Sequence, residues 1–409
     1  MSKQLFESQW KATKAALCEG RDLETNQDGS RNETKKRVME ICLENARRDL
    51  MSRSKLFETS TTGAVSSGNV ATLNKVILPI IRRVMPTVIA NEIIGVQPMT
   101  GPVAQIHTLR VRYADTVGSP NAVTAGTEAM APWDIYRFYS GNENSTYPGA
   151  APTSVLEGRR GNKLSIQILK DTVEARTRRL SATWTIEAAQ DAQAQQGIDI
   201  ESELMAVVAQ EITAEIDQEI LSSLMRLPGA PTMIYDQANV SGTATYVGDE
   251  HAALAIMINK AANDIAQRTR RGAANWAVVS NAALTILQSA GTSAFARTTE
   301  GTFEAPTNTK YVGTLNNSMR VYVNAYAAES DPILIGYKGP SEADAAAFYC
   351  PYVPLTTTGV IIHPDTLEMI IGFLTRYGYL ELSNSSSSLG NAADYVSLIG
   401  INNSNLKWM

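Results

Sequence analysis

Residues 199–226, DIESELMAVVAQEITAEIDQEILSSLMR, form the stretch that decides the fold of this chain. Aliphatic side chains recur at every fourth position, which is typical of a long helix with one buried face. Pro228 and Gly229 follow and end the pattern, because proline has no amide hydrogen to continue a helix. At about 1.5 Å per residue the helix would span ~40 Å. The recurring residues are Ile200, Leu204, Val208, Ile212, Ile216, Ile220 and Leu224.

The other face of this helix is acidic. Clustered carboxylates could serve a metal or an acid–base site, but an acidic helix face is more often a surface that contacts solvent or a partner protein. We therefore expect a solvated or partner-facing surface. The carboxylates are those of Glu201, Glu203, Glu211, Glu215, Asp217 and Glu219.

Two strand-like segments precede the helix, at residues 105–113 and 163–170, and in both of them apolar and polar residues partly alternate. Residues 175–186 extend this pattern. The residues between the two segments are rich in Pro, Gly, Asn and Ser, and they far exceed the ~4–6 residues of an ordinary connection. A two-stranded arm that projects from the body explains this spacing. Since an isolated hairpin is only marginally stable in water, we expect the arm to lie on a neighbouring molecule.

The remainder of the chain predicts a mixed α+β protein. Two amphipathic helices, at 3–19 and 34–51, precede a Ser-, Thr- and Gly-rich linker at 59–69. Residues 383–409 are polar and poorly patterned, and we expect an irregular tail there. Further helices are predicted at 70–85, 88–94, 250–268 and 281–289, and strands at 276–280, 319–324, 333–337, 346–349, 359–363 and 367–375.

The composition excludes several classes of protein. The 409 residues are 44% hydrophobic and 19% charged, as in an ordinary folded chain. The net charge of −5 differs from the basic excess of a dedicated nucleic-acid reader, so any contact with DNA must be local and electrostatic. No apolar run reaches the ~20 residues that span a bilayer, and the N-terminus lacks the apolar core of a signal peptide. We expect a protein that folds in the cytoplasm and has no membrane partner.

Residues suited to catalysis or metal binding are scarce and scattered. None of the cysteines or histidines has a second ligand at metal-binding spacing, and no common enzymatic motif occurs. We expect no disulfide framework, no metal and no cofactor. These residues are Cys18, Cys42, Cys350, His107, His251 and His363.

Several longer strings are specific enough to indicate a family. They are TGAV (62–65) with LPIIRRVMPTVIANEIIGVQPMTGPVAQIHTLRVRY (78–113), EARTRRLSATWTIEAAQDAQAQQGIDIESELMAVVAQEITAEIDQEIL (174–221), IAQRTRRGAANW (265–276), MRVYVNAYAAESDPILIGYKGPSEADAAAFYCPYVPL (319–355) and MIIGFLTRYGY (369–379). These blocks closely resemble the major capsid proteins of T-even-type tailed bacteriophages, and they occur in the same order.

The resemblance implies the tailed-phage major capsid fold, an α+β fold with a long spine helix, a peripheral domain, an axial domain, an extended loop and an N-terminal arm. The sequence places these parts in order. We expect an N-terminal arm of two helices and a linker at 1–69, a first peripheral part at 70–112, the extended loop at 113–163, a peripheral part with the spine helix 199–226 at 164–247, the axial domain at 248–350, peripheral return strands at 351–382 and a C-terminal tail at 383–409.

The resemblance also implies a function. A protein of this family self-assembles into hexamers and pentamers of an icosahedral capsid, the virion head that encloses double-stranded phage DNA, and it catalyses nothing. Its partners would be itself, portal, scaffold and decoration proteins, and DNA without sequence preference, with assembly in the cytoplasm of the host bacterium. Two alternatives stay open: an encapsulin-type nanocompartment shell, which shares the fold, and a soluble α+β enzyme.

The chain departs from the T-even-type pattern in two respects. The extended loop is too short to hold the extra domain that those proteins insert beside it. Leu56-Phe57-Glu58 fits the Leu-x-Glu pattern after which proteins of this family lose an N-terminal segment, but Leu5-Phe6-Glu7 fits it equally. Glu58 is therefore a candidate protease cleavage position that we expect to be unused. The retained segment would then form two arm helices that clamp adjacent subunits from inside the shell.

Arginine pairs are the remaining candidate functional residues. Arg82 and Arg83 are candidates for contact with DNA, although cations are also favoured at the end of a helix by its dipole. Arg159 and Arg160 are candidates for charged contacts with the acidic helix face of a neighbouring subunit, as are Arg178 and Arg179. Each of them could equally be a solvated surface charge.

Overall fold

The computed structural model describes residues 33–57, 88–117, 123–127, 152–158, 160–196, 199–240, 247–269, 271–290, 295–297, 310–316, 318–340, 344–363, 368–382 and 392–402, together with residues 10, 14, 18, 129, 139–141, 150, 366 and 406. The predicted linker at 59–69 and the predicted helix at 70–85 lie outside these residues. Of the helix predicted at 3–19, Trp10, Lys14 and Cys18 are described, and all three are helical.

The long helix is present as α9 (Ile200–Arg226), as predicted. Asp199 caps it, because its carboxylate accepts a hydrogen bond from the N–H of Glu201 at 3.1 Å. Five of the recurring aliphatic residues are buried and the first two are partly buried. The expectation of a uniformly exposed acidic face is wrong at Asp217, which is 1% exposed because its carboxylate bonds to the backbone of Ile89 inside the core.

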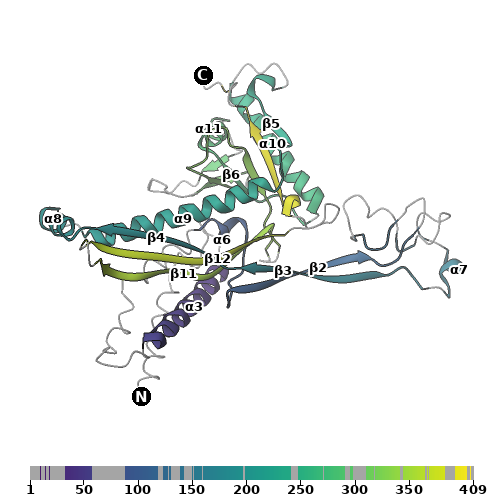
Figure 1. Cartoon of the computed structure of the whole chain (residues 1–409). Coiled ribbons are helices and arrows are strands. Elements are labelled where there is room, and N and C mark those ends of the chain that lie inside the picture. Colours follow the sequence, from purple (N-terminus) through teal and green to yellow (C-terminus); the bar gives the residue numbers. More distant parts are fainter. Residues whose placement is uncertain are drawn as a thin grey trace.

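α9 lies along a four-stranded sheet (Figure 1). Its strands, in spatial order, are β1 (Gly95–Val96), β11 (Ala347–Ile362), β12 (Met369–Glu381) and β4 (Arg176–Trp184). In this sheet β1 pairs in parallel with β11, and β12 is antiparallel to both of its neighbours, β11 and β4. Alternate residues of β12 are buried, from Ile371 to Tyr377, which is the pattern of a sheet with one covered face.

The two strands predicted at 346–349 and 359–363 are the ends of one strand, β11. Its pairing with β12 shifts register at three places, between Pro351 and Val353, between Val353 and Thr356, and between Thr357 and Val360. Such shifts are β-bulges, which place an extra residue on one strand. Since each bulge interrupts the alternation of side chains, the sequence pattern does not show β11 as a single strand.

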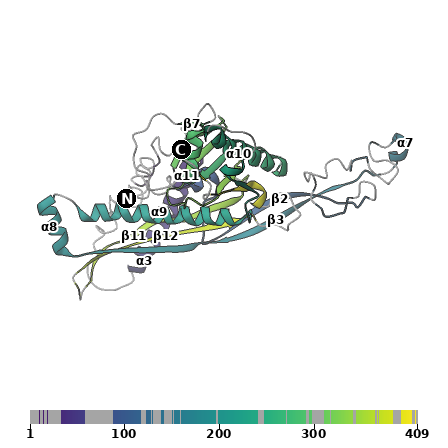
Figure 2. The same ribbon diagram turned by 90° about the horizontal axis from the view of Figure 1, so that it is seen from above.

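The predicted arm is a two-stranded antiparallel ribbon. β2 (Val103–Tyr113) pairs along its whole length with β3 (Leu164–Glu174). Only Ala175 separates β3 from β4, so the ribbon continues directly into the four-stranded sheet. A short helix, α7 (Thr153–Leu156), lies near the tip of the ribbon, and α8 (Ile186–Gln196) follows β4 at the other end of the molecule (Figures 1 and 2).

A seven-stranded mixed sheet with two helices forms the second half of the body. In spatial order its strands are β5 (Met233–Tyr235), β13 (Val396–Ile401), β10 (Ile333–Gly336), β6 (Trp276–Val279), β9 (Met319–Val323), β8 (Lys310–Leu315) and β7 (Phe295–Arg297). The helices are α10 (Val247–Thr269) and α11 (Asn281–Ser289). A 3-10 turn, η2 (Gln237–Asn239), precedes α10.

The expectation of an irregular tail at 383–409 is wrong for residues 392–401. A 3-10 turn, η3 (Ala392–Tyr395), leads into β13, which lies between β5 and β10 inside the seven-stranded sheet. β13 has the sequence VSLIGI and is almost entirely buried. Both β5 and β13 fall outside the range 248–350 from which the sequence would build this part of the molecule.

Two N-terminal helices join the halves. α3 (Glu33–Phe57) is longer than the predicted helix at 34–51, and it packs against β11. The side-chain amide of Asn45 in α3 donates hydrogen bonds to the carbonyl oxygens of Met99 and Tyr352, at 2.7 and 2.9 Å. The short helix α6 (Ala90–Ile93) is completely buried.

Candidate functional site

Residues that could bind a metal are dispersed over the part of the chain that the structure describes. No group of three or more His, Cys, Asp or Glu residues among them could hold a metal ion. The histidines are dispersed: His107 is exposed on β2, His251 lies in α10 against Ser289, and His363 follows β11. In the same residues no helix combines the length and the apolar character needed to cross a membrane.

The three cysteines are unsuited to nucleophilic chemistry. Cys18, Cys42 and Cys350 are all buried. Burial raises the pKa of Cys42 and that of Cys350 to about 12. Since the thiolate is the reactive form, neither of these two thiols is activated at neutral pH.

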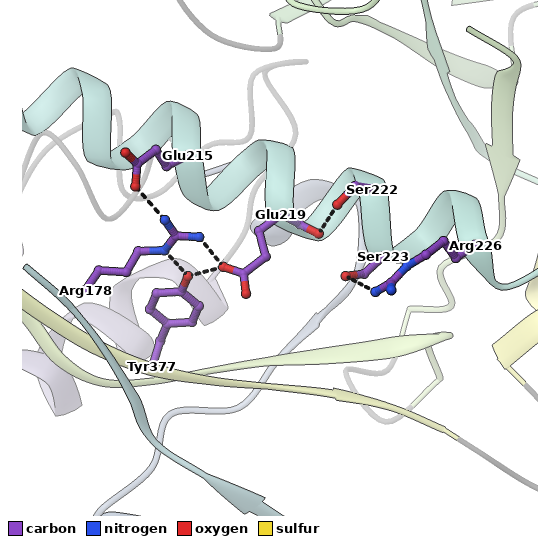
Figure 3. A network of polar contacts seen from close by, with 7 residues as sticks. All are labelled: Arg178, Glu215, Glu219, Ser222, Ser223, Arg226 and Tyr377. Carbon is purple, nitrogen blue, oxygen red and sulfur yellow. Dashed lines mark hydrogen bonds and ion pairs between the residues drawn. The ribbon is translucent and has the colours of Figure 1, made fainter.

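A polar network fastens the long helix α9 to the sheet beneath it (Figure 3). Arg178 of β4 donates hydrogen bonds to Glu215 at 2.5 Å and to Glu219 at 2.6 Å, both in α9. Its Nε donates to the hydroxyl oxygen of Tyr377 in β12 at 2.6 Å, and that hydroxyl donates to Glu219. One arginine thereby joins three elements of the body.

The network favours the charged forms of Arg178 and Glu219, because it raises the pKa of the arginine and lowers that of the glutamate. Burial alone would lower the pKa of Arg178, but its bonds to Glu219 and Tyr377 outweigh burial and raise it. Burial alone would raise the pKa of Glu219, but the hydrogen bonds from Arg178 and Tyr377 outweigh burial and lower it. The pair therefore stays ionised at neutral pH.

A second polar cluster holds α3 and α6 against the seven-stranded sheet. Lys35 of α3 donates to Glu92 of α6 at 2.6 Å, and the two side chains are only 4% and 1% exposed. Arg320 of β9 lies 3.6 Å from the same carboxylate, and the hydroxyl of Tyr322 donates to it at 3.4 Å. The Glu92 carboxylate is buried between two cations. Removal of one cation would leave a buried charge that is only partly compensated, so this contact strongly favours one arrangement of α3, α6 and β9.

The ribbon presents a surface that is unusual for a folded monomer. Leu164, Ile166 and Ile168 of β3 are 56%, 67% and 66% exposed. At the tip, by contrast, Tyr113 and Tyr139 pack with their ring centroids 4.5 Å apart in a small core of their own. The ribbon is therefore a preformed projection with an uncovered aliphatic face, which is typical of a protein–protein contact.

The candidate residues from the sequence fall in different places. Glu58, Arg82, Arg83 and Arg159 lie outside the described residues. Arg160 is described and exposed, beside the start of β3.

Arg178 was a candidate for contact with the acidic face of α9 in a neighbouring subunit. In the structure it forms ion pairs with Glu215 and Glu219 of α9 in its own chain. Arg179, its neighbour on β4, is exposed. Lys35, Glu92 and Arg320 were not predicted as a site, because they are spread over the whole chain and no local spacing connects them.

Comparison with known proteins identifies the family. A family model described as major capsid protein Gp23 matches residues 70–401 of this chain. The chain belongs to this family of major capsid proteins. It is 28% identical to the major capsid protein of Enterobacteria phage T4, over 78% of this chain and 77% of the phage protein. It is 29% identical to that of Vibrio phage KVP40, over 83% of this chain and 82% of the phage protein.

Family membership confirms the resemblance that the sequence showed and the α+β tailed-phage capsid fold that it implied. The capsid protein is a structural component of the phage virion and associates with further copies of itself. The encapsulin-type alternative is not favoured. Among solved structures, the capsid of Myoviridae phage XM1 is similar with a TM-score of 0.43 and 11% identity, over 76% of this chain and 90% of that chain. Mycobacterium phage Cain gives a TM-score of 0.41 and 12% identity, over 84% of this chain and 96% of that chain.

Proposed function

We propose that this capsid protein assembles into hexamers and pentamers that form an icosahedral head around double-stranded phage DNA. The projecting β2–β3 ribbon carries this proposal. Its exposed aliphatic residues gain a dry surface only when a neighbouring copy covers them, and at ~25 cal/mol per Å2 of buried apolar surface even a modest contact contributes several kcal/mol. Many repeated contacts of this kind stabilise a shell.

The parts of the fold take the following roles in this proposal. α9 is the spine helix, and with the four-stranded sheet it forms the peripheral domain. The extended loop comprises residues 113–163 at the end of the ribbon. The axial domain is the seven-stranded sheet with α10 and α11, extended beyond 248–350 to include β5 and β13. The N-terminal arm covers residues 1–69 and includes α3, which stays attached when Glu58 is not cleaved.

The other partners follow from the same proposal. Portal, scaffold and decoration proteins complete the head, and assembly takes place in the cytoplasm of the host bacterium. DNA contacts the inner surface electrostatically and without sequence preference, with Arg82 and Arg83 as candidate contacts. Arg159 and Arg160 are candidates for charged contacts between subunits. The function involves no catalysis.

The test is velocity sedimentation of the purified chain, followed by negative-stain electron microscopy of the fast fraction. We expect shells, tubes or curved sheets built of six-membered rings, with five-membered rings where the surface closes. A stable 44.3 kDa monomer at every concentration and salt would contradict self-assembly of the chain. Nuclease-protected DNA in particles recovered from infected cells would separate a head from a protein-filled compartment.

A further inference from the structure

The segment 88–94, VIANEII, is buried at every position and connects distant parts of the molecule. It contains α6 and leads into β1. The backbone N–H of Ile89 donates to Asp217 of α9 at 2.9 Å, and the carboxylate of Glu92 accepts from Lys35 of α3 at 2.6 Å. Buried polar groups need partners of this kind, because water does not reach them. The segment therefore binds two helices that lie far from it in the sequence.

The seven-stranded sheet reaches the same segment through Glu92, whose two carboxylate oxygens have different partners. Oε1 accepts the hydrogen bond from Lys35. Oε2 accepts a hydrogen bond from the hydroxyl of Tyr322 at 3.4 Å and lies 3.6 Å from a guanidinium nitrogen of Arg320, and both of these residues belong to β9. The carboxylate is only 1% exposed. One of its oxygens thus faces α3, and the other faces the seven-stranded sheet.

α3 is anchored to the body at two places. Lys35 fixes its first turn at Glu92, as described above. About 15 Å further along the helix, at 1.5 Å per residue, Asn45 donates to the carbonyl oxygens of Met99 and Tyr352. Between the two anchors the side chain of Cys42 enters the main core and is completely buried. α3 is therefore seated against β11 by one anchor and against the Glu92 junction by the other.

The two anchors differ, because only the partner of Lys35 is shared with the sheet. While α3 is seated, Lys35 is within hydrogen-bond distance of the carboxylate and Arg320 lies just beyond it. If α3 leaves its seat, Arg320 is the remaining cation among the described neighbours of Glu92. A buried carboxylate that loses one cation depends more strongly on the other, since its charge must still be compensated.

We propose that Glu92 couples the seating of α3 to the position of β9. When α3 leaves, Arg320 closes onto the carboxylate and draws β9 toward the segment 88–94. When β9 moves away, Lys35 alone compensates the charge. A coupling between two sites is reciprocal, so a molecule that draws α3 from its seat also changes the seven-stranded sheet, without touching it. The coupling acts within one chain and needs no neighbouring copy.

The test measures how fast iodoacetamide alkylates Cys42 in the folded, full-length chain. The thiol is completely buried, so the reagent reaches it only when α3 leaves its seat, and the rate reports this local opening. Lys35→Met should accelerate alkylation about tenfold. In an Arg320→Met chain the same change should accelerate it about a hundredfold, because neither of the two cations then compensates Glu92.

Arg320→Met alone provides the decisive sign. It removes the cation that takes over the carboxylate when α3 is displaced, so it destabilises the open state more than the seated state. Alkylation of Cys42 should therefore become slower than in the wild type. If Arg320 merely supported the fold, its loss would accelerate alkylation instead. Circular dichroism before alkylation verifies that each variant is folded.

Asn45→Ala is the matched control for Lys35→Met. It removes the other anchor of α3, which has no bond to Glu92, and should accelerate alkylation by the same factor with and without Arg320. A second control keeps the test valid if the variant without both cations does not fold. In a chain that carries Lys35→Met and Glu92→Leu, Arg320→Met should leave the alkylation rate unchanged, because the carboxylate that connects the two sites is absent.

The possible outcomes separate coupling from independent support. Lys35→Met effects that are equal with and without Arg320 would overturn the proposal, because the two cations would then act independently. Faster alkylation in Arg320→Met alone would overturn it as well. An effect of Arg320→Met that persists in the chain without Glu92 would show that the sheet and α3 communicate by another route.

Discussion

The carboxyl group of Asp217 in α9 accepts a hydrogen bond from the backbone N–H of Ile89 at 2.9 Å inside the core. Burial raises the pKa of Asp217 to about 8, and its second oxygen, Oδ2, has no hydrogen-bond partner among the residues that the structure describes. α9 is thus joined to the segment before α6 through a carboxyl group that is mostly protonated at neutral pH.

The first prediction concerns the pH dependence of stability. Between the ordinary pKa of 3.8 and the folded value of about 8, the folded chain keeps the proton of Asp217 and the unfolded chain loses it. The free energy of unfolding must therefore fall as pH rises through this interval. Asp217→Asn cannot ionise and removes this fall. We expect its melting temperature to exceed that of the wild type near pH 8 and to approach it near pH 4.

The control is Glu211→Gln, at an exposed position of the same helix, which should leave the melting temperature unchanged at both pH values. An Asp217→Asn variant that is less stable than the wild type at pH 8 would contradict the prediction.

The second prediction concerns the buried pair of Lys35 and Glu92. Lys35→Met leaves the Glu92 carboxylate in the core with Arg320 at 3.6 Å as its remaining cation. We expect a loss of about 3 kcal/mol in chemical denaturation, the low end of the range for removal of one buried partner. The amides of α3 should exchange faster with deuterium, because the helix is less firmly held.

A double variant provides the control for this pair. Lys35→Met combined with Glu92→Leu removes both charges and should recover most of the stability. A single Lys35→Met variant as stable as the wild type, with unchanged protection of α3, would show that the pair does not hold the helix.

The sequence predicted the elements whose pattern is local. The aliphatic repeat of α9 is uninterrupted, and α11 has the bounds that were expected because Ser280 caps its first turn with a hydrogen bond to the N–H of Ala283. β13 was missed because its six residues stand alone among polar neighbours and are buried only by pairing with β5 and β10.

The polar junctions could not be predicted, because they depend on contacts between distant parts of the chain. Lys35 and Glu92 are 57 residues apart, and Glu92 and Tyr322 are 230 residues apart. The acidic residues of α9 illustrate the same limit. α9 holds the exposed Glu211, the paired Glu219 and the buried Asp217, and their environments depend on which neighbouring strands and segments pack against each side of the helix.

The third prediction concerns the network of Figure 3. Tyr377→Phe keeps the ring, whose centroid lies 5.5 Å from that of Tyr349, and removes only the hydroxyl that bonds to both Arg178 and Glu219. We expect a loss of about 1 kcal/mol in the free energy of unfolding. Because the network lowers the pKa of Glu219 below its ordinary 4.5, its contribution is present above that pH and is lost as pH falls. The difference in stability between Tyr377→Phe and the wild type should therefore shrink in acid.

The control is Arg179→Ala on the same strand, which should change stability little at any pH. A difference between Tyr377→Phe and the wild type that grows in acid would contradict this reading of the network.

The fourth prediction concerns the centre of the seven-stranded sheet, where Gly336 of β10 stands opposite Trp276 of β6. A Cβ at position 336 would overlap the indole ring of Trp276, which is completely buried. Gly336→Ala should therefore destabilise the protein by about 1–3 kcal/mol, the usual cost of an overpacked core. Gly161→Ala is the matched control, since a Cβ there meets no heavy atom within 4 Å.

Trp276→Phe distinguishes a steric conflict from a general weakness of strand β10. Alone, the smaller ring leaves a cavity and lowers stability. In the background of Gly336→Ala the same change makes room for the new methyl group, so the double variant should be more stable than the sum of the two single losses predicts. Additive losses in a thermal or chemical unfolding series would mean that the indole ring does not set the requirement for glycine at position 336.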